Sequence, residues 1–149
     1  MLGRWKGSVI KEKMKADIAI ISRQCVKKGL NRGDIYLEDI YDMNCRNRLC
    51  TFRVRGKKLL NMLQYNLNLD ISEQIYISGC ELEINKIDGK MEIVESSIEP
   101  EKEYFVVIED YLAERARKFF GVEIEFQKTD YDVYDLLLDW LTKNRIIKG

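Results

Sequence analysis

Hydrophobic and polar residues alternate along several short stretches of the chain, and this period of two predicts β-strands. Residues 48–55, RLCTFRVR, place Cys50, Phe52 and Val54 on one face of such a strand. The Asp88-Gly89 pair predicts a hairpin turn between two further strands. Strands are also expected at residues 17–21, 75–77, 80–87, 91–96, 104–108 and 122–126.

A period near 3.6 predicts helices elsewhere. Residues 57–67 carry leucines along one side, and further helices are expected at 2–15 and at 131–144, the last one capped by Asp130. The stretch Glu109–Phe120, EDYLAERARKFF, follows a buried strand, where a glycine turn could present backbone N–H groups to a ligand; it favours a helix instead. This order of elements predicts an α+β fold with mixed sheets.

Composition supports one folded domain over residues 1–149. Hydrophobic residues make up 46% and charged residues 34%, with a single proline. No stretch approaches the roughly 18 consecutive apolar residues of a membrane span. The basic N-terminus has no apolar core, so we expect no secretory signal, no membrane and a cytoplasmic location.

The net charge is zero but unevenly distributed. Residues 1–75 hold 15 Lys/Arg against 8 Asp/Glu, and residues 76–149 hold 10 against 17. No acidic residue occurs from Met43 to Leu69, although six basic residues lie there. An anion site or an acidic partner is one explanation. The alternative is that the two halves neutralise each other within one fold.

The four cysteines and the absence of histidine restrict the chemistry. Cys25, Cys45, Cys50 and Cys80 form no C-x-x-C pair, which argues against a metal site and favours buried thiols. Without histidine the chain has neither the commonest general base nor a Ser-His or Cys-His pair. Any catalysis would depend on carboxylates, lysine or tyrosine.

Six segments follow one another along the chain: LGRWKGSVI, ADIAIIS, GDIYLEDIYDM, NRLCTFRVRGKKLLNML, YISGCELEI and EKEYFVVIEDYLA. Their order and spacing, from about residue 2 to 143, resemble the C-terminal domain of the 5′-nucleotidase family, which includes UDP-sugar hydrolases and 2′,3′-cyclic nucleotide phosphodiesterases. The family has Lys-x-Tyr-x-Val-x-x-x-Asp-Tyr-Leu-Ala where the last segment lies. The resemblance implies an α+β fold in which helices pack outside mixed sheets, in α/β/β/α layers.

The resemblance also implies a division of labour. In the family, an N-terminal metallophosphatase domain holds two metals and the catalytic histidine and aspartates, and the C-terminal domain binds the nucleotide. This chain begins near the start of the second domain, so we expect no cofactor, metal ligand or catalytic residue in it. We expect no hydrolysis by this chain alone, which agrees with its lack of histidine.

The family's substrate loop, Asn-x-Gly-Gly-Ile-Arg, corresponds to residues 22–27, SRQCVK. Both glycines are replaced, and the final arginine becomes Lys27, which keeps the charge but loses the planar fork of arginine. Arg23 matches a position that some members fill with a basic residue. Arg23 and Lys27 are therefore candidate anion contacts; the alternative is that they are solvated loop charges.

The family's Pro-Phe-x-Asn turn keeps only Asn47 here, and Arg48 follows as a further candidate contact, unless it snorkels from the rim of the core. The tyrosine of the family's Asn-Asp-Tyr-Leu-Ala segment stacks on the base, and Tyr111 retains it. The Gly-Gly-Asp-Gly that follows has become residues 115–118, RARK, so the acid that contacts the base is lost. Tyr111 either stacks on a base or packs at the rim of the core.

Three hypotheses follow. The chain is a catalytically incomplete substrate-binding domain that binds a nucleotide or another anion. Alternatively, it is the non-catalytic half of a two-chain hydrolase and pairs with a separate metallophosphatase chain. Alternatively, it is a structural module without a ligand, with a homodimer as the expected assembly. Nucleic-acid binding ranks last, because the basic strand and helix are committed to packing.

Overall fold

The computed structural model describes residues 2–23, 35–36, 48–143 and 147–148. None of the helices within these ranges is long and apolar enough to cross a lipid bilayer. The elements are α1 (Leu2–Met14), β1 (Ile18–Ser22), β2 (Ile35–Tyr36), β3 (Arg48–Arg55), α3 (Gly56–Leu67), the 3₁₀ helix η2 (Ile71–Glu73), β4 (Ile75–Ser78), β5 (Leu82–Ile87), β6 (Lys90–Ser96), β7 (Glu103–Glu109), α4 (Asp110–Ala113), α5 (Ala116–Phe120), β8 (Gln127–Asp132), α6 (Val133–Lys143) and β9 (Ile147–Lys148).

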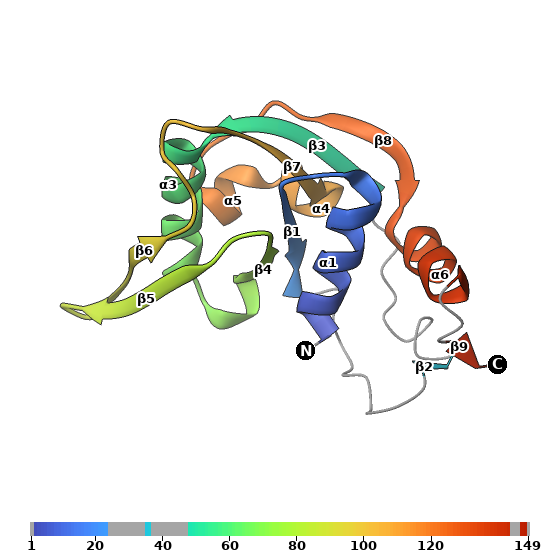
Figure 1. Cartoon of the computed structure of the whole chain (residues 1–149). Helices are drawn as coiled ribbons and strands as arrows, with labels where there is room; N and C mark the ends of the chain where they lie inside the picture. The colour runs from blue at the N-terminus through green and yellow to red at the C-terminus, as the bar shows by residue number, and fades with distance from the viewer. Residues whose placement is uncertain (1, 24–34, 37–47, 144–146, 149) are drawn as a thin grey trace.

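Five strands form one mixed sheet in the order β4-β1-β7-β3-β8 (Figure 1). Strands β1 and β7 are parallel to each other. Strand β4 runs antiparallel to β1, β3 runs antiparallel to β7, and β8 runs antiparallel to β3. Ile20 lies opposite Ile108, and Leu49 lies opposite Glu109, so the ends of β1 and β7 meet the start of β3. We call this the β1–β7 edge; it comprises residues 22–23, 48–49 and 109–111.

The five-stranded sheet is covered on both faces. Helices α1 and α6 pack on one face, and α3, α4 and α5 pack on the other (Figure 1). Successive residues of β1 therefore point into two cores, Ala19 and Ile21 into the first and Ile18 and Ile20 into the second. This explains why β1 is buried throughout and why its first four residues are all apolar rather than alternating. The structure confirms the α+β class with mixed sheets.

Helix α3 has the amphipathic character that the leucine spacing predicts. Leu59, Met62 and Leu63 are buried against the sheet, whereas Leu60 and Leu67 are half-buried. The helix begins one residue before the expected position, at a glycine whose added Cβ would collide with the carbonyl oxygen of Glu99. The close approach of the 99–102 backbone thus fixes where α3 begins.

The β5–β6 hairpin forms a separate two-stranded sheet that lies against α3 (Figure 1). Two side-chain amides of α3 bond the backbone of β6. Gln64 accepts from Ile93 N at 2.9 Å and donates to Met91 O at 2.6 Å. Asn68 accepts from Met91 N and donates to Met91 O, both at 3.1 Å. The second sheet is therefore attached through α3, and the predicted hairpin turn at Asp88-Gly89 is confirmed.

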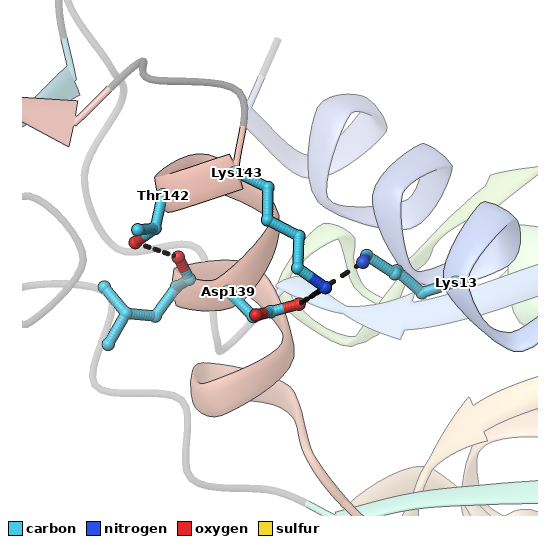
Figure 2. Close-up of polar contacts among 5 residues, drawn as sticks. Lys13, Asp139, Thr142 and Lys143 are labelled. Carbon is cyan, nitrogen blue, oxygen red and sulfur yellow. Dashed lines mark hydrogen bonds and ion pairs between the residues drawn. The ribbon is translucent and has the colours of Figure 1, made fainter.

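Helix α6 is joined to α1 by one carboxylate. Asp139 Oδ2 lies 3.1 Å from Lys143 Nζ, one turn along α6, and 3.3 Å from Lys13 Nζ on α1 (Figure 2). These hydrogen bonds lower the pKa of Asp139 and raise the pKa of Lys143. Beneath them, Val133 and Leu137 pack in the same core as Ile10 of α1.

Two sequence-based predictions near the C-terminus are wrong. Residues 122–126 do not form a strand; β8 begins at Gln127, where Thr51 pairs with it. Ile124 and Phe126 are nevertheless half-buried against the α3 side of the core. The N-cap of α6 is not Asp130, because the helix begins at Val133 and Asp132 Oδ1 accepts a hydrogen bond from Asp135 N at 3.4 Å. Residues 127–132, QKTDYD, form strand β8, so α6 begins three residues later than Asp130.

Candidate functional site

Three of the five predicted ligand contacts lie at or directly beside the β1–β7 edge. Arg23 follows the last residue of β1, Arg48 is the first residue of β3, and Tyr111 follows β7 within α4. The side chain of Arg48 is exposed. Lys27 and Asn47 lie outside the described residues. The sheet register therefore brings two cations and one aromatic ring to one edge, although their role in binding stays a prediction.

A buried ion pair supports this edge from below. Lys6 Nζ lies 3.2 Å from Glu109 Oε2, and both side chains are completely buried. The other carboxylate oxygen, Oε1, accepts a hydrogen bond from Ser22 N at 2.6 Å. Glu109 thus holds the last residue of β1 beside the last residue of β7. Because α1 supplies the ammonium group, three elements are locked together directly beneath Arg23 and Tyr111.

Arg23 stacks on a tyrosine of the neighbouring strand. Its guanidinium carbon lies 4.5 Å from the ring centroid of Tyr76 in β4, and Nη1 donates to the Tyr76 hydroxyl at 3.1 Å. Its buried Nε has no hydrogen-bond partner among the described residues. Arg23 also lines a cavity of about 540 Å³, together with apolar side chains of α3, β4 and β5. This planar cation is therefore held in place by the fold and is not a freely solvated charge.

Tyr111 is covered by another arginine. The guanidinium carbon of Arg115 lies 4.3 Å from the Tyr111 ring centroid, and Arg115 Nη1 donates to the Tyr111 carbonyl oxygen at 3.1 Å. The Phe119 ring packs nearby, at 5.7 Å between centroids with the planes tilted by 56°. A base that stacks on the face under Arg115 would first have to displace the guanidinium.

The segment after β7 is helical, as its residues predict. It forms α4, then Glu114 and Arg115, then α5. Its charges are tied to the next stretch of chain, because Glu114 pairs with Lys128 at 2.8 Å and Arg117 pairs with Glu123 at 3.4 Å. The Lys128 ammonium lowers the pKa of Glu114, and the Glu114 carboxylate raises the pKa of Lys128. Side-chain pairs occupy the place where a glycine turn would expose backbone N–H groups.

The described cysteines are unsuited to nucleophilic chemistry. Burial raises the pKa of Cys50 and of Cys80 to about 11, so both are neutral thiols at physiological pH. Cys50 is fully buried in β3, and Cys80 is half-buried before β5. Within the described part of the chain, no group of three or more cysteine and acidic side chains is arranged to hold a metal ion.

The ion pair beneath the edge and the two arginine–tyrosine stacks were not anticipated from the sequence. A signal for the ion pair exists. Lys6 lies three and four positions before Val9 and Ile10, on the apolar face of α1, and Glu109 directly follows the apolar run of β7. Two opposite charges at positions that the pattern reserves for apolar residues indicate a buried pair.

The sequence profile of the family described as 5′-nucleotidase, C-terminal domain matches residues 2–122. A comparison with curated proteins gives no significant match. Among solved structures, the chain is similar to a 5′-nucleotidase precursor from Thermus thermophilus, with a TM-score of 0.71 and 15% identity. It is also similar to the NAD nucleotidase of Haemophilus influenzae, with a TM-score of 0.77 and 19% identity, and to a sulfate thiohydrolase of Thermus thermophilus, with a TM-score of 0.61 and 14% identity.

These matches cover 97–99% of this chain but only 33%, 30% and 29% of the three proteins, in the order given. The chain thus spans about a third of the length of the structures it resembles. At such identities the likeness establishes the fold, and the three names show that the fold accompanies more than one activity. Together, the profile match and the shared architecture show that this chain belongs to the 5′-nucleotidase C-terminal domain family.

Proposed function

We propose that this chain is a substrate-binding domain that binds a phosphate-bearing ligand, a nucleotide or another, at the β1–β7 edge and is catalytically incomplete on its own. The observation that carries the proposal is the position of Arg23, Arg48 and Tyr111 at this edge, fixed by the register of three strands. The absence of histidine from the sequence supports the second part.

The contacts at the edge favour recognition of the anionic group over recognition of a base. Arg48 is exposed, and Arg23, although it stacks on Tyr76, keeps N–H donors beyond the one that bonds the Tyr76 hydroxyl. Guanidinium groups pair with phosphate oxygens through two parallel hydrogen bonds. Tyr111, in contrast, already has the Arg115 guanidinium on its ring. Binding of a phosphate at the edge therefore requires no rearrangement at Tyr111, whereas a base that stacks on the face under Arg115 has to displace that guanidinium.

Isothermal titration with AMP, ribose 5-phosphate and inorganic phosphate tests the proposal. We expect saturable binding of the first two and an affinity about tenfold lower after Arg48→Ala, since a charge-assisted hydrogen bond contributes about 1.5–3 kcal/mol. Lys90→Ala, on the exposed hairpin, is the matched control and should leave the affinity unchanged. Flat heats with every ligand, or equal weakening in both variants, would reject the proposal.

A second candidate is the binding half of a two-chain nucleotide hydrolase. It is favoured by the coverage of the similar structures, which are about three times as long as this chain and include two nucleotidases. Co-purification from the native source should then recover a separate metallophosphatase chain, and adding that chain should produce nucleotide hydrolysis. Hydrolysis by the purified domain alone would contradict both candidates.

A further inference from the structure

A second cavity lies at the opposite end of β3 from the β1–β7 edge. Arg48 begins this strand and Arg55 ends it, so at about 3.3 Å per residue the two ends are roughly 23 Å apart. The cavity, of about 460 Å³, opens between the first turns of α3 and the end of α5. We call it the α3–α5 groove. Every residue that lines it belongs to the continuous described range 48–143.

The groove has an apolar floor and an aromatic wall. Met62 and Phe120 form the floor, and each side chain is only 1% exposed. Tyr65 stands beside them at 45% exposure, which is unusually open for a ring that borders a core. Its position is fixed by Gly121, whose left-handed backbone has φ of +75° and where an added Cβ would lie 2.7 Å from the ring. The fold thus holds one flat aromatic surface open to solvent.

The rim of the groove is basic. Arg55, Lys57 and Lys58 line one end, and Asn61 lies one turn further along α3. No acidic side chain lines the groove, and none of the three cations forms an ion pair within the described part of the chain. The side chain of Arg55 donates a hydrogen bond to the backbone carbonyl of Glu101, at 3.2 Å. These cations belong to the acid-free segment 43–69 of the sequence, and Glu103, which lies opposite Arg55 in the register of β3 and β7, instead pairs with Arg53 at 3.8 Å.

The cations and the ring have a definite separation. Lys58, Asn61 and Tyr65 recur at spacings of three and four along α3, which places them on one stripe of the helix. Lys58 and Tyr65 are seven positions apart, so their backbones are about 10 Å apart along the helix axis. A ligand that uses both ends must carry a compact negative group and a flat apolar group within that length. Small-molecule sites commonly combine such an apolar wall with a few charged groups.

We propose that the α3–α5 groove binds a small anion that carries a flat apolar ring, of the chemical class of an aryl phosphate. The phosphate lies among Arg55, Lys57 and Lys58, and the ring packs on Tyr65 above Met62. This site is independent of the β1–β7 edge, because the two share no residue and lie at opposite ends of the same strand.

Titration of the ¹⁵N-labelled chain with 1-naphthyl phosphate, followed by amide chemical shifts, tests the proposal. We expect saturable shifts at Asn61 and Gly121, and an affinity for inorganic phosphate alone at least about tenfold weaker, because it lacks the ring. Lys57→Ala/Lys58→Ala should lower the affinity for the aryl phosphate about tenfold or more. Lys86→Ala/Lys90→Ala removes two exposed lysines of the hairpin and should leave that affinity unchanged.

Tyr65→Leu provides a second, independent variant, because it keeps an apolar side chain beside Gly121 while removing the ring. It should reduce the affinity for 1-naphthyl phosphate and leave that for inorganic phosphate unchanged. Shifts confined to Ser22, Arg23 and Tyr111 would overturn the groove site while supporting ligand binding at the β1–β7 edge. An absence of shifts in the groove, or equal affinities in the two double variants, would also overturn it.

Discussion

The ammonium of Lys6 lies 3.2 Å from the carboxylate of Glu109, and both side chains are fully buried although 103 positions separate them in the sequence. Moving two charges out of water is costly, and their attraction and hydrogen bonds offset that cost only while both partners are present. The backbone N–H of Ser22 contributes one such hydrogen bond. The end of β7 therefore depends on a residue near the start of the chain.

Replacing one partner of this pair should be severe. Glu109→Gln keeps the shape of the side chain but removes the negative charge that lies 3.2 Å from the buried Lys6 ammonium, and we expect a loss of about 3–5 kcal/mol of unfolding free energy in urea denaturation. Glu103→Gln, in the exposed pair with Arg53 at 3.8 Å, is the control and should cost less than about 1 kcal/mol. Similar losses in both variants would show that the buried pair has no special role.

Asn66 should be the most sensitive amide of α3. It is 3% exposed, its Nδ2 donates to the carbonyls of Glu73 and Phe119, and its Oδ1 accepts from Ile75 N. Asn66→Ala leaves these groups without partners and should lower the unfolding free energy by about 3 kcal/mol. The exposed Asn68 also makes three hydrogen bonds, and Asn68→Ala should cost less than about 1 kcal/mol. Equal costs would contradict burial as the cause.

Arg115→Ala should uncover the ring of Tyr111. An exposed cation–π contact contributes about 0.5–1 kcal/mol, so its removal should raise the affinity for AMP about threefold. The affinity for ribose 5-phosphate, which has no base, should stay the same. Calorimetric titration of both ligands gives the ratio of the affinity for AMP to the affinity for ribose 5-phosphate. If the substitution leaves this ratio unchanged, Arg115 does not compete with a base.

The thiols of Cys50 and Cys80 should react slowly with a disulfide reagent. Burial raises their pKa to about 11, and a rise of two units leaves about 100-fold less thiolate at a given pH. The measurement uses native protein carrying Cys25→Ser and Cys45→Ser, with protein unfolded in urea as the control. Reaction of the native variant as fast as that of the unfolded chain would refute the prediction.

The contact between α1 and α6 should weaken in acid. Lys143 and Lys13 lower the pKa of Asp139 in the folded state, so its contribution to stability is present above its unfolded pKa of about 3.9 and is lost as pH falls through the lower folded value. The melting temperature of Asp139→Asn should therefore lie slightly below that of the parent at about pH 6, and the difference should shrink below about pH 4. Glu125→Gln, which removes an exposed carboxylate that forms no ion pair with the described residues, should show no such trend.

Periodicity alone predicts most of the secondary structure. Strand β3 has the predicted bounds, because its alternating pattern ends at Gly56 and the helical spacing of leucines in α3 follows directly. The prediction fails at β8, where VEIEF looks like a strand but QKTDYD forms one. The apolar residues of 122–126 alternate because Ile124 and Phe126 pack against the core. The backbone of β3, in contrast, pairs with the polar residues that begin at Gln127. Pairing with a neighbour outweighs local β-propensity there.

The candidate site is less predictable than the fold. The resemblance places Arg23, Arg48 and Tyr111, but it does not show that Arg115 covers the tyrosine or that Tyr76 holds Arg23. Each of these contacts depends on a side-chain direction that the backbone pattern does not specify. The α3–α5 groove is likewise hidden, because it needs the left-handed Gly121 to lie against Tyr65, more than fifty positions earlier in the sequence.

The amides of Gln64 and Asn68 have a consequence for association between molecules. They bond the backbone of β6 as an adjacent strand would, so β6 offers fewer free groups to a strand from another chain at Met91 and Ile93. Exposed edges are where sheets of separate molecules join and aggregate. The helix thereby shields the β6 side of the hairpin from pairing with another molecule, and the exposed Glu83 places a negative charge on β5, the other strand.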